Sequence, residues 1–357
     1  MPELFVTNYN ARFTGVSSTA QRMAVHHLQR HDLALVGQPL PGLPDPITPR
    51  AARQLSRTPP KGRPFAIWHV RRDPEMISAL YARDILRLPI RTVFTSAAKH
   101  RHGALPRWLI GRMDAVIATS PDAASFFPDV AATLPHGVDV DAYQPAANRC
   151  AAWESLGYGG THGVAIIGRV RSSKGTDVFV DAMIRVMATD PGVHALIVGL
   201  AKPSEDAFVS DLHARIAAAG LGGRFHFTGA LPLDHLRTEV LPALSLVVNV
   251  ARYEPFGVVP IEGMAAGTPF VCSDTGHYRA FSDGGRTGLI VPTDDAEATA
   301  AAVGELLSDP DRIESMGRAA RDKAVADHSI AREADGAAEI YERLWAGEDL
   351  AVHRPPL

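Results

Sequence analysis

Cysteine is scarce in this sequence. Its 357 residues include two cysteines, Cys150 and Cys272, which are too few for a disulfide framework, so a reducing compartment is expected. No apolar run approaches the roughly 20 residues that a membrane-spanning helix needs. The first residues, MPELFVTNYNAR, also lack the basic and then apolar pattern of a signal peptide. We therefore expect a cytoplasmic protein that at most rests on a membrane surface.

The signatures of a bound dinucleotide and of a metal are also missing. The glycine-rich stretch Gly157–Gly163 comes before an expected strand and lacks the G-x-G-x-x-G spacing, which must follow a strand and begin a helix. This argues against a dinucleotide-dependent oxidoreductase. Asp139 and Asp141 form a D-x-D pair at an expected turn, where a turn or cap role is favoured. No pair among the 15 histidines has convincing metal-ligand spacing, so we expect no metal and no resident cofactor.

The net charge is small but unevenly distributed. The chain has 36 Lys and Arg against 39 Asp and Glu, a net charge of −3, which argues against a nucleic-acid-binding protein. Residues 1–145 hold 17 basic and 11 acidic side chains, a net of +6, and the rest hold 19 and 28, a net of −9. Residues 50–112 alone carry 14 basic and 3 acidic side chains. This basic segment indicates an anionic partner, unless its arginines are dispersed and paired elsewhere.

Short apolar, β-branched runs alternate with helical patterns along the whole chain. This alternation predicts parallel sheets built from strand–helix–strand units, and the continuous apolar runs predict sheets that are covered on both faces. The length fits two domains, each with its own core. The predicted fold class is therefore α/β, with two Rossmann-like, doubly wound parallel-sheet domains.

Two segments interrupt the alternation. Residues 39–64 contain eight prolines and little hydrophobic period, which predicts a long surface loop. A second, glycine-containing break lies around residues 143–163 and predicts a linker. We expect an N-terminal domain over 1–145, a linker over 146–160 and a C-terminal domain over 161–335. A C-terminal helix and tail over 336–357 would pack back on the N-terminal domain.

The strongest local signal is the run Arg252-Tyr-Glu-Pro-Phe-Gly-Val-Val-Pro-Ile-Glu262. It follows an apolar strand, so it lies at the carboxyl end of that strand, where open α/β sheets bind ligands. A helix should begin around Phe256–Val258, and its free backbone N–H groups suit a phosphate. Glu254 and Glu262 could hold two parts of one extended ligand by accepting hydrogen bonds from hydroxyls. The alternative is that Glu254 complements the helix dipole and that Glu262 is a solvated surface residue.

A second signal is Gly168-Arg-Val-Arg-Ser-Ser-Lys174-Gly, directly between a strand and a helix. Gly168 allows a tight turn. Arg169 offers a planar fork and Lys174 a compact charge, a pairing that suits a diphosphate. The alternative, solvated loop cations, becomes less probable because two such loops follow strands of the same half.

The first half gives weaker signals. Gly15 can approach a ligand closely, although the run around it also reads as a plain helix cap. His69 ends an apolar strand and is followed by Arg71 and Arg72. His100 and His102 follow the next strand. A histidine at a strand end can orient a hydroxyl, but a structural role is favoured for each of these taken alone.

Together these residues resemble a known family. Glu254 and Glu262 resemble the E-x7-E motif of retaining GT-B glycosyltransferases of family 4. Further matching runs are G-R-V-x-x-x-K-G (168–175), P-H-G-V-D (135–139), G-A-L-P (229–232) and G-T-P-F-V-C-S-D (267–274). In the first half, R-F-T-G-V-S-S-T (12–19), W-H-V-R-R (68–72) and F-T-S-A-A (94–98) resemble the lipopolysaccharide core mannosyltransferases of alphaproteobacteria.

The resemblance implies the GT-B architecture, with the two domains facing across a cleft, and a role for each motif residue. It implies four catalytic residues: Arg169, Lys174, Glu254 and His102. It implies a donor site formed by Gly15, Gly168, Arg169, Lys174, Gly199, Leu231, Glu254, Phe256, Gly257, Val258 and Glu262. The acceptor would meet His69, Arg71, Arg72 and His100. One departure matters: family members often carry a histidine in an H-D pair where this chain has Thr95-Ser-Ala-Ala98, so that role is vacant or has moved to His102, His100 or His69.

The implied reaction is the transfer of mannose from GDP-mannose, without metal and with retention, to Kdo on lipid A. The partners would be a nucleotide sugar, an anionic lipid-linked glycan and the anionic inner face of the inner membrane. The alternatives are a family 4 transferase that uses a UDP- or ADP-sugar on another surface glycan, or a non-catalytic nucleotide-sugar-binding subunit. The sequence leaves the base, the linkage position and the oligomeric state open.

Overall fold

The structure is a computed structural model that describes residues 1–12, 14–98, 101–254 and 256–351. The chain forms two compact units, which are described separately below. The first unit comprises Met1–Gly137 together with Ile330–Leu357, and the second comprises Val138–Ser329. Each unit contains one six-stranded sheet in which all pairings are parallel.

The sheet of the first unit has the strand order β2-β1-β3-β4-β5-β6. Its elements, in chain order, are β1 (Leu4–Asn8), α1 (Gly15–His27), β2 (Leu33–Gly37), α2 (Pro49–Leu55), β3 (Ala66–Val70), α3 (Asp73–Leu80), the π-helical turn η1 (Tyr81–Ile85), β4 (Ile90–Ser96), α4 (Ala104–Ile110), β5 (Ala115–Ala118), α5 (Pro121–Ala124), β6 (Ala132–Thr133) and α15 (Ile330–Trp345). Because β1 is followed on one side by β2 and on the other by β3, the winding direction reverses between β1 and β3.

The sheet of the second unit has the strand order β12-β11-β10-β7-β8-β9. Its elements are α6 (Arg149–Ser155), β7 (His162–Ile167), η2 (Ser172–Lys174), α7 (Thr176–Thr189), β8 (Val193–Val198), η3 (Pro203–Glu205), α8 (Asp206–Ala218), η4 (Gly222–Arg224), β9 (Phe225–Gly229), α9 (Leu233–His235), η5 (Leu236–Val240), α10 (Leu241–Ala243), β10 (Leu246–Asn249), α11 (Val258–Ala265), β11 (Phe270–Ser273), α12 (Tyr278–Ser282), η6 (Asp283–Gly285), β12 (Gly288–Val291), α13 (Ala296–Leu307) and α14 (Pro310–Asp327). The winding direction reverses between β7 and β10.

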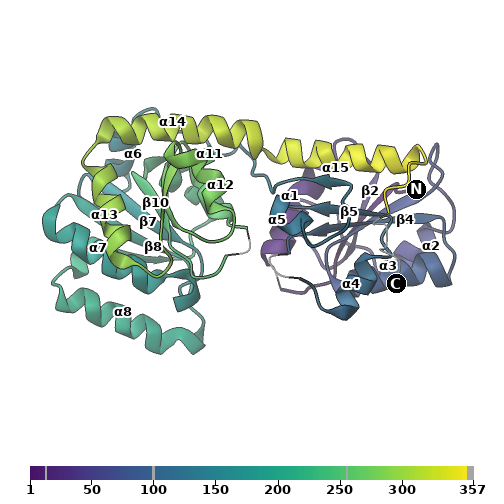
Figure 1. Ribbon diagram of the computed structural model, residues 1–357, viewed down its shortest axis with the longest axis horizontal. Helices are drawn as coiled ribbons and strands as arrows, with labels where there is room; N and C mark the ends of the chain where they lie inside the picture. The colour runs from purple at the N-terminus through teal and green to yellow at the C-terminus, as the bar shows by residue number, and fades with distance from the viewer. Residues whose placement is uncertain (13, 99–100, 255, 352–357) are drawn as a thin grey trace. The chain divides into compact units, whose positions relative to one another are not determined.

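Both faces of each sheet are buried. On β7, Val164 and Ile166 pack into a core with α7 and α13, whereas Ala165 and Ile167 pack into another core with α11 and α12, and Figure 1 shows these helix pairs on opposite faces of the sheet. Successive side chains of a strand point to opposite faces, so a strand with both faces covered must be apolar throughout. Polar side chains are therefore left to the loops at the strand ends.

The segment 39–64 differs from the predicted loop, because it contains helix α2. Thr48 caps the helix by accepting a hydrogen bond at Oγ1 from the N–H of Ala51 (3.1 Å), and Pro49 occupies its first position. Threonine followed by proline is a favoured helix start. The prolines on both sides of this short helix conceal that signal in the sequence.

The expected linker also differs from the structure. Residues 146–160 contain α6, whose Trp153 is buried and packs against Gly163 of β7, where an added Cβ would lie 2.1 Å from the indole. The structure therefore assigns this segment to the second unit and places the division between Gly137 and Val138 rather than at 145. The C-terminal helical region is divided into α14 and α15. Among the described residues, no helix is both long and apolar enough to cross a membrane.

Helix α15 completes the core of the first unit, although it lies almost 200 residues after the other elements of that unit. Its Tyr341 is fully buried, and the Tyr341 ring lies 5.4 Å from that of His27 and 5.8 Å from that of His69. Burial lowers the pKa of His27 to about 3 and holds that of His69 well below its usual range. Both imidazoles are therefore neutral in the folded protein at neutral pH.

This burial predicts acid sensitivity. Unfolding exposes both histidines to water, where they bind protons below pH 6.5, so the free energy of unfolding should fall by about 1.4 kcal/mol per pH unit for each buried histidine. Urea unfolding at pH 7, 6 and 5 measures this slope. His27→Gln should remove the contribution of His27 to this pH dependence of the free energy of unfolding. His213→Gln, at an exposed position of α8, is the control and should leave the slope unchanged. Equal slopes in wild type and His27→Gln would contradict the assignment.

Candidate functional site

The loops that follow β7 and β10 lie at the point where the winding of the second sheet reverses. Strand β7 pairs with β10 on one side and β8 on the other, all parallel. Their carboxyl ends therefore share one edge, and adjacent loops diverge there to leave a crevice. A recess at this edge is lined by Gly168, Arg169, Lys174 and Asn249, among others. This edge brings together the two loops that carry the strongest sequence signals.

Backbone hydrogen bonds join the loops at this edge. The N–H of Gly168 donates to the carbonyl of Val198 (2.9 Å), and the N–H of Gly199 donates to that of Gly229 (2.8 Å). Gly199 has a φ of +140°, and a Cβ there would lie 1.8 Å from the carbonyl oxygen of Gly168. Only glycine allows so close an approach of two backbones. Gly168 and Gly199 therefore shape the floor of the recess.

Lys174 and Glu254 form an ion pair across the reversal point. The Nζ of Lys174, at the end of η2, lies 2.5 Å from Oε2 of Glu254, in the loop after β10. The side chains are 23% and 14% exposed, so solvent screens the pair less than it would a fully exposed one. An ammonium group has three donors. Lys174 can therefore hold Glu254 and a phosphate oxygen at the same time.

Arg252 holds the two loops together, a role that the sequence did not reveal. Its guanidinium donates to both carboxylate oxygens of Asp177, at 2.8 and 2.9 Å, and to the backbone carbonyl of Ser172. A further ion pair joins it to Asp294. The hydrogen bonds to these carboxylates raise the pKa of Arg252 above its usual range. Because Ser172 begins η2, this network positions Lys174.

Arg169 is exposed, next to the recess. Within the described ranges its guanidinium makes neither an ion pair nor a hydrogen bond with the protein. All five of its donors are therefore available to an anionic ligand. Lys174 and Arg169 differ in this respect, because Lys174 already has a carboxylate partner.

Helix α11 begins next to this pair, as the sequence predicted. Gly257 precedes the helix with a φ of +94°, and a Cβ there would lie 2.1 Å from Cε1 of Tyr278. Among the described residues no side chain caps the helix start, so its first N–H groups, at Val258 and the following residue, can meet a phosphate. Phe256 is buried against the core beneath. Glu262 is 7% exposed, which rules out a solvated surface role for it.

Leucine side chains lie near the Gly199–Gly229 contact. Leu231 is partly buried against the core, whereas Leu200 is 63% exposed and lies 3.8 Å from the position that a Cβ of Gly229 would take. An exposed leucine beside a glycine turn offers an apolar surface to a planar base. Leu200 could not be recognised from the sequence, because a single leucine after a strand gives no signal.

Gly15 lies in the first unit, unlike the other residues of the predicted donor site. It is the first residue of α1, and Thr14 caps this helix by accepting from the N–H of Ser17 (3.4 Å). The guanidinium of Arg72 donates to Asn8 Oδ1 (3.1 Å) and Ser17 Oγ (3.0 Å), and also to Thr14 and Glu75. Arg72 therefore joins the end of β3 to the start of α1, and its predicted contact with an acceptor stays a prediction.

His69 and Arg71 are also buried rather than open to a ligand. His69 is fully buried, with Nδ1 at 2.5 Å from the hydroxyl of Tyr341 and Nε2 at 2.7 Å from Oγ1 of Thr95. Both of its nitrogens have protein partners in this structure, and its predicted contact with an acceptor stays a prediction. Arg71 is 9% exposed, its N–H donates to Glu75 Oε2 (2.8 Å), and burial lowers its pKa. The place of His69 and Arg71 at the end of an expected strand did not reveal that their side chains are buried.

His102 is half-buried in the loop between β4 and α4. Its ring lies 6.0 Å from that of Phe127, and within the described part of the chain its Nε2 has no hydrogen-bond partner. Burial lowers the pKa of His102, and the nearby carboxylate of Asp73 opposes that shift. This nitrogen is buried, and the predicted catalytic role of His102 stays a prediction. His100 lies outside the described residues, so its predicted acceptor role stays a prediction.

The acidic pair Asp139 and Asp141 forms a turn, as predicted. Oδ1 of Asp139 accepts from the N–H groups of Asp141 and Ala142, both at 3.2 Å. Over the ranges that the structure describes, no three histidine, cysteine, aspartate or glutamate side chains are grouped closely enough to hold a metal ion.

This geometry predicts how the recess binds a nucleoside diphosphate. Lys174→Ala and Arg169→Ala should each weaken the binding of GDP or UDP about tenfold or more, because each removes a charge-assisted hydrogen bond to phosphate. Isothermal titration calorimetry measures the dissociation constants. Arg318→Ala, at an exposed position of α14, is the control and should bind as the wild type does. Unchanged affinity in both recess variants would exclude the recess as the diphosphate site.

Comparison with known proteins now identifies the family. Residues 156–323 match the family model of group 1 glycosyl transferases. The lipopolysaccharide core biosynthesis mannosyltransferase LpsB of Rhizobium meliloti (strain 1021) is 36% identical over 349 residues, 96% of this chain and 97% of that protein. The mannosyltransferase LpcC of Rhizobium leguminosarum bv. viciae, of the same description, is 35% identical over 96% of each chain. The crystal structure of HepE from Anabaena with UDP has a TM-score of 0.80 at 18% identity and covers 95% of this chain and 99% of that one; this likeness shows the fold, which is GT-B. The chain is therefore a glycosyltransferase that belongs to the group 1 family, with rhizobial lipopolysaccharide core mannosyltransferases among its relatives.

Proposed function

We propose that the protein transfers mannose from GDP-mannose to a Kdo hydroxyl of a lipid A precursor during synthesis of the lipopolysaccharide core. One observation carries this proposal. Two relatives named as lipopolysaccharide core mannosyltransferases are 35–36% identical to this chain over 96% of its length. Identity of that extent includes both units, and hence both the donor motifs and the elements of the first unit.

In this proposal the recess of the second unit holds the donor. Arg169 and Lys174 bind the diphosphate together with the N–H groups at the start of α11. Glu254, held in place by Lys174, accepts hydrogen bonds from hydroxyls of the mannose, and Glu262 accepts from the ribose. The guanine lies against Gly199, Leu231 and the exposed Leu200.

The reaction needs stabilisation of a leaving group. The bond between the anomeric carbon of mannose and the diphosphate oxygen breaks, and a new bond forms from that carbon to the acceptor oxygen. The acceptor proton passes to the departing diphosphate, so GDP leaves and the configuration is retained. Two fixed cations and a helix N-terminus stabilise the growing negative charge without a metal, which is electrostatic preorganisation.

The basic segment of residues 50–112 supports an anionic, lipid-linked acceptor. Its 14 basic and 3 acidic side chains belong to the first unit. Such a segment attracts both a glycolipid that carries phosphate and carboxylate groups and the anionic cytoplasmic leaflet. The enzyme would then work as a peripheral protein at the inner face of the inner membrane.

A donor screen tests the proposal. Purified enzyme with a Kdo-containing lipid A precursor should transfer mannose from GDP-mannose at a rate at least a hundredfold above that with UDP- or ADP-sugars. Mass spectrometry of the lipid and NMR of the new anomeric proton identify the product and its configuration. Preferred transfer from a UDP- or ADP-sugar would overturn the donor assignment, and binding of every donor without transfer would indicate a non-catalytic subunit.

His102 provides a second test. If its neutral imidazole binds the donor sugar, His102→Ala should lower kcat about tenfold, the value of one hydrogen bond to the reacting group. Because burial lowers the pKa of His102, the wild-type rate should stay constant as pH falls to 6.5 and decline only below that. His213→Ala is the control. An unchanged kcat in His102→Ala would remove this residue from the catalytic set.

A further inference from the structure

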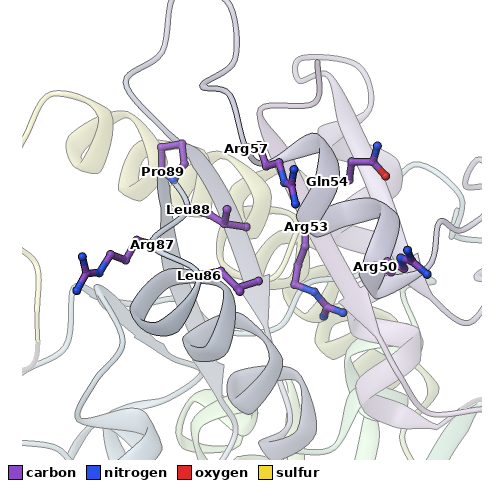
Figure 2. A pocket seen from close by; sticks show the side chains of 8 residues that line it. All are labelled: Arg50, Arg53, Gln54, Arg57, Leu86, Arg87, Leu88 and Pro89. Carbon is purple, nitrogen blue, oxygen red and sulfur yellow. The ribbon is translucent and has the colours of Figure 1, made fainter.

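A second basic site lies in the first unit, on the side of α2. It is an open cavity of about 720 Å³ between α2 and the turn that follows η1. Its lining consists of Arg50, Arg53, Gln54, Arg57, Leu86, Arg87, Leu88 and Pro89. Figure 2 shows Arg53 and Arg57 projecting into the space between the two elements, with Arg50 and Arg87 at its outer edges. We refer to this cavity as the arginine pocket.

The arginines of the pocket have no acidic partners. Within the described ranges, none of the four forms an ion pair or a hydrogen bond through its guanidinium. Other arginines of the same unit do have carboxylate partners, for example Arg63 with Glu342 and Arg83 with Asp114. Four of the 14 basic side chains of the segment therefore gather in this pocket without a carboxylate partner among the described residues.

The spacing of these arginines is unfavourable unless an anion is bound. Arg50 and Arg53 lie three residues apart on α2 and so project from one side of it, and Arg57 lies in the turn directly after the helix. Like charges at this spacing destabilise a helix. A phosphate group, which planar guanidinium groups bind in a bidentate manner, would convert this repulsion into attraction.

Arg87 occupies a backbone conformation that glycine adopts more easily. Its φ is +52°, in the left-handed region, and it directly follows the C-terminal residue of the α3–η1 helix. Glycine is the usual residue at such a helix end. An arginine at this position costs free energy in backbone strain. Binding of a ligand by the Arg87 side chain would account for the presence of arginine there.

Exposed apolar side chains surround the pocket. Leu86 lines the pocket and is 41% exposed, and Arg53 lies 5.8 Å from the ring of Tyr81, which is 46% exposed. Among the described residues, half of the exposed large hydrophobic side chains lie between residues 77 and 108: Ile77, Tyr81, Ile85, Leu86, Leu105 and Trp108. We call these six side chains the apolar rim.

The two helices that carry the apolar rim are adjacent. Arg112, directly after α4, forms an ion pair with Asp84 of η1 (2.9 Å), and its guanidinium also lies 5.1 Å from the ring of Trp108. Ile77, Tyr81 and Ile85 recur at every fourth residue and so form one stripe along α3–η1. Large contiguous apolar patches on a protein surface mark interaction sites, and tryptophan and tyrosine are typical of membrane interfaces.

The pocket is separate from the residues predicted to contact substrate. The turn at Leu86–Pro89 leads directly into β4, so it lies at the amino edge of the parallel sheet. His69, Arg71 and His102 lie at its carboxyl edge. A ligand of the pocket is therefore not the reacting acceptor hydroxyl.

We propose that the face formed by α2, α3–η1 and α4 docks on an anionic phospholipid bilayer, with the arginine pocket holding the phosphate of a lipid headgroup and the apolar rim entering the interface. A bilayer is the occupant because it alone presents dense phosphates beside an apolar phase, matching the unpaired arginines and their exposed apolar neighbours. The proposal rests on the proposed function in one respect, that the acceptor is a lipid at the membrane. Docking at the amino edge of the sheet leaves the carboxyl edge free for the glycan portion of that lipid.

Vesicle sedimentation at low salt, without donor or acceptor, tests this docking independently of transferase activity. The full-length protein should bind phosphatidylcholine vesicles that contain 30% phosphatidylglycerol and bind pure phosphatidylcholine at least tenfold more weakly. Arg53→Ala combined with Arg57→Ala should lower the partition coefficient about tenfold or more, since each basic side chain near the surface adds to membrane attraction. Arg87→Gly should also lower the partition coefficient severalfold. The Tm of this variant should not fall, because glycine adopts the backbone conformation at position 87 more easily than arginine does. Ile85→Ser should weaken binding severalfold at high salt as well, because its contribution is apolar.

The matched control is Arg185→Ala combined with Arg318→Ala, which removes the same charge from exposed positions of the second unit. It should change binding less than twofold. Equal losses in the two double variants would overturn the proposal, because net charge and not the pocket would then govern binding. A different outcome would identify the pocket as a site for soluble phosphate and overturn the docking proposal. In that outcome calorimetry detects binding of inorganic phosphate to the wild type but not to the Arg53→Ala, Arg57→Ala variant, and the variant binds vesicles as the wild type does.

Discussion

The parallel pairing of β7 with both β8 and β10 is the constraint on which the proposed donor site depends. Both faces of the sheet are buried by apolar side chains, so the carboxyl edge is where the chain can present polar groups. At that edge the loops of β7 and β10 diverge, and the Lys174–Glu254 ion pair spans them. Gly199 and Gly257 are required by close contacts with backbone or ring atoms beneath, and Arg252 fixes the η2 turn that carries Lys174. Lys174 and Glu254 are therefore held in place by protein contacts, whereas Arg169 is left to a ligand.

Electrostatics divides the tasks between the units. The second half of the chain is acidic overall, so the cations proposed to bind phosphate are local features of it: Glu254 holds Lys174, and Asp177 holds Arg252, which positions the turn that carries Lys174. The first unit pairs some of its arginines, such as Arg63 and Arg83, and leaves those of the arginine pocket unpaired. In the proposed function, the cations of the second unit bind the anionic donor, and the arginine pocket binds phosphates of the membrane that holds the lipid acceptor.

The sequence predicted those features that depend on local patterns. The apolar runs specified two parallel sheets, and the motif around Glu254 and Gly257 placed a helix start at the correct strand end. Its predictions differed from the structure where distant residues decide the outcome. The burial of His69 depends on Tyr341 in a helix at the other end of the chain, and the role of Arg252 depends on Asp177 and Asp294. Helix α2 was hidden among prolines, and with it the spacing that creates the arginine pocket.

The most direct test of the central claim is a crystal structure of the protein with GDP. The account predicts the β-phosphate within about 3 Å of Lys174 Nζ and of the Arg169 guanidinium, the range of charge-assisted hydrogen bonds, with the start of α11 facing the same phosphate. A diphosphate bound away from the loops that follow β7 and β10 would contradict it.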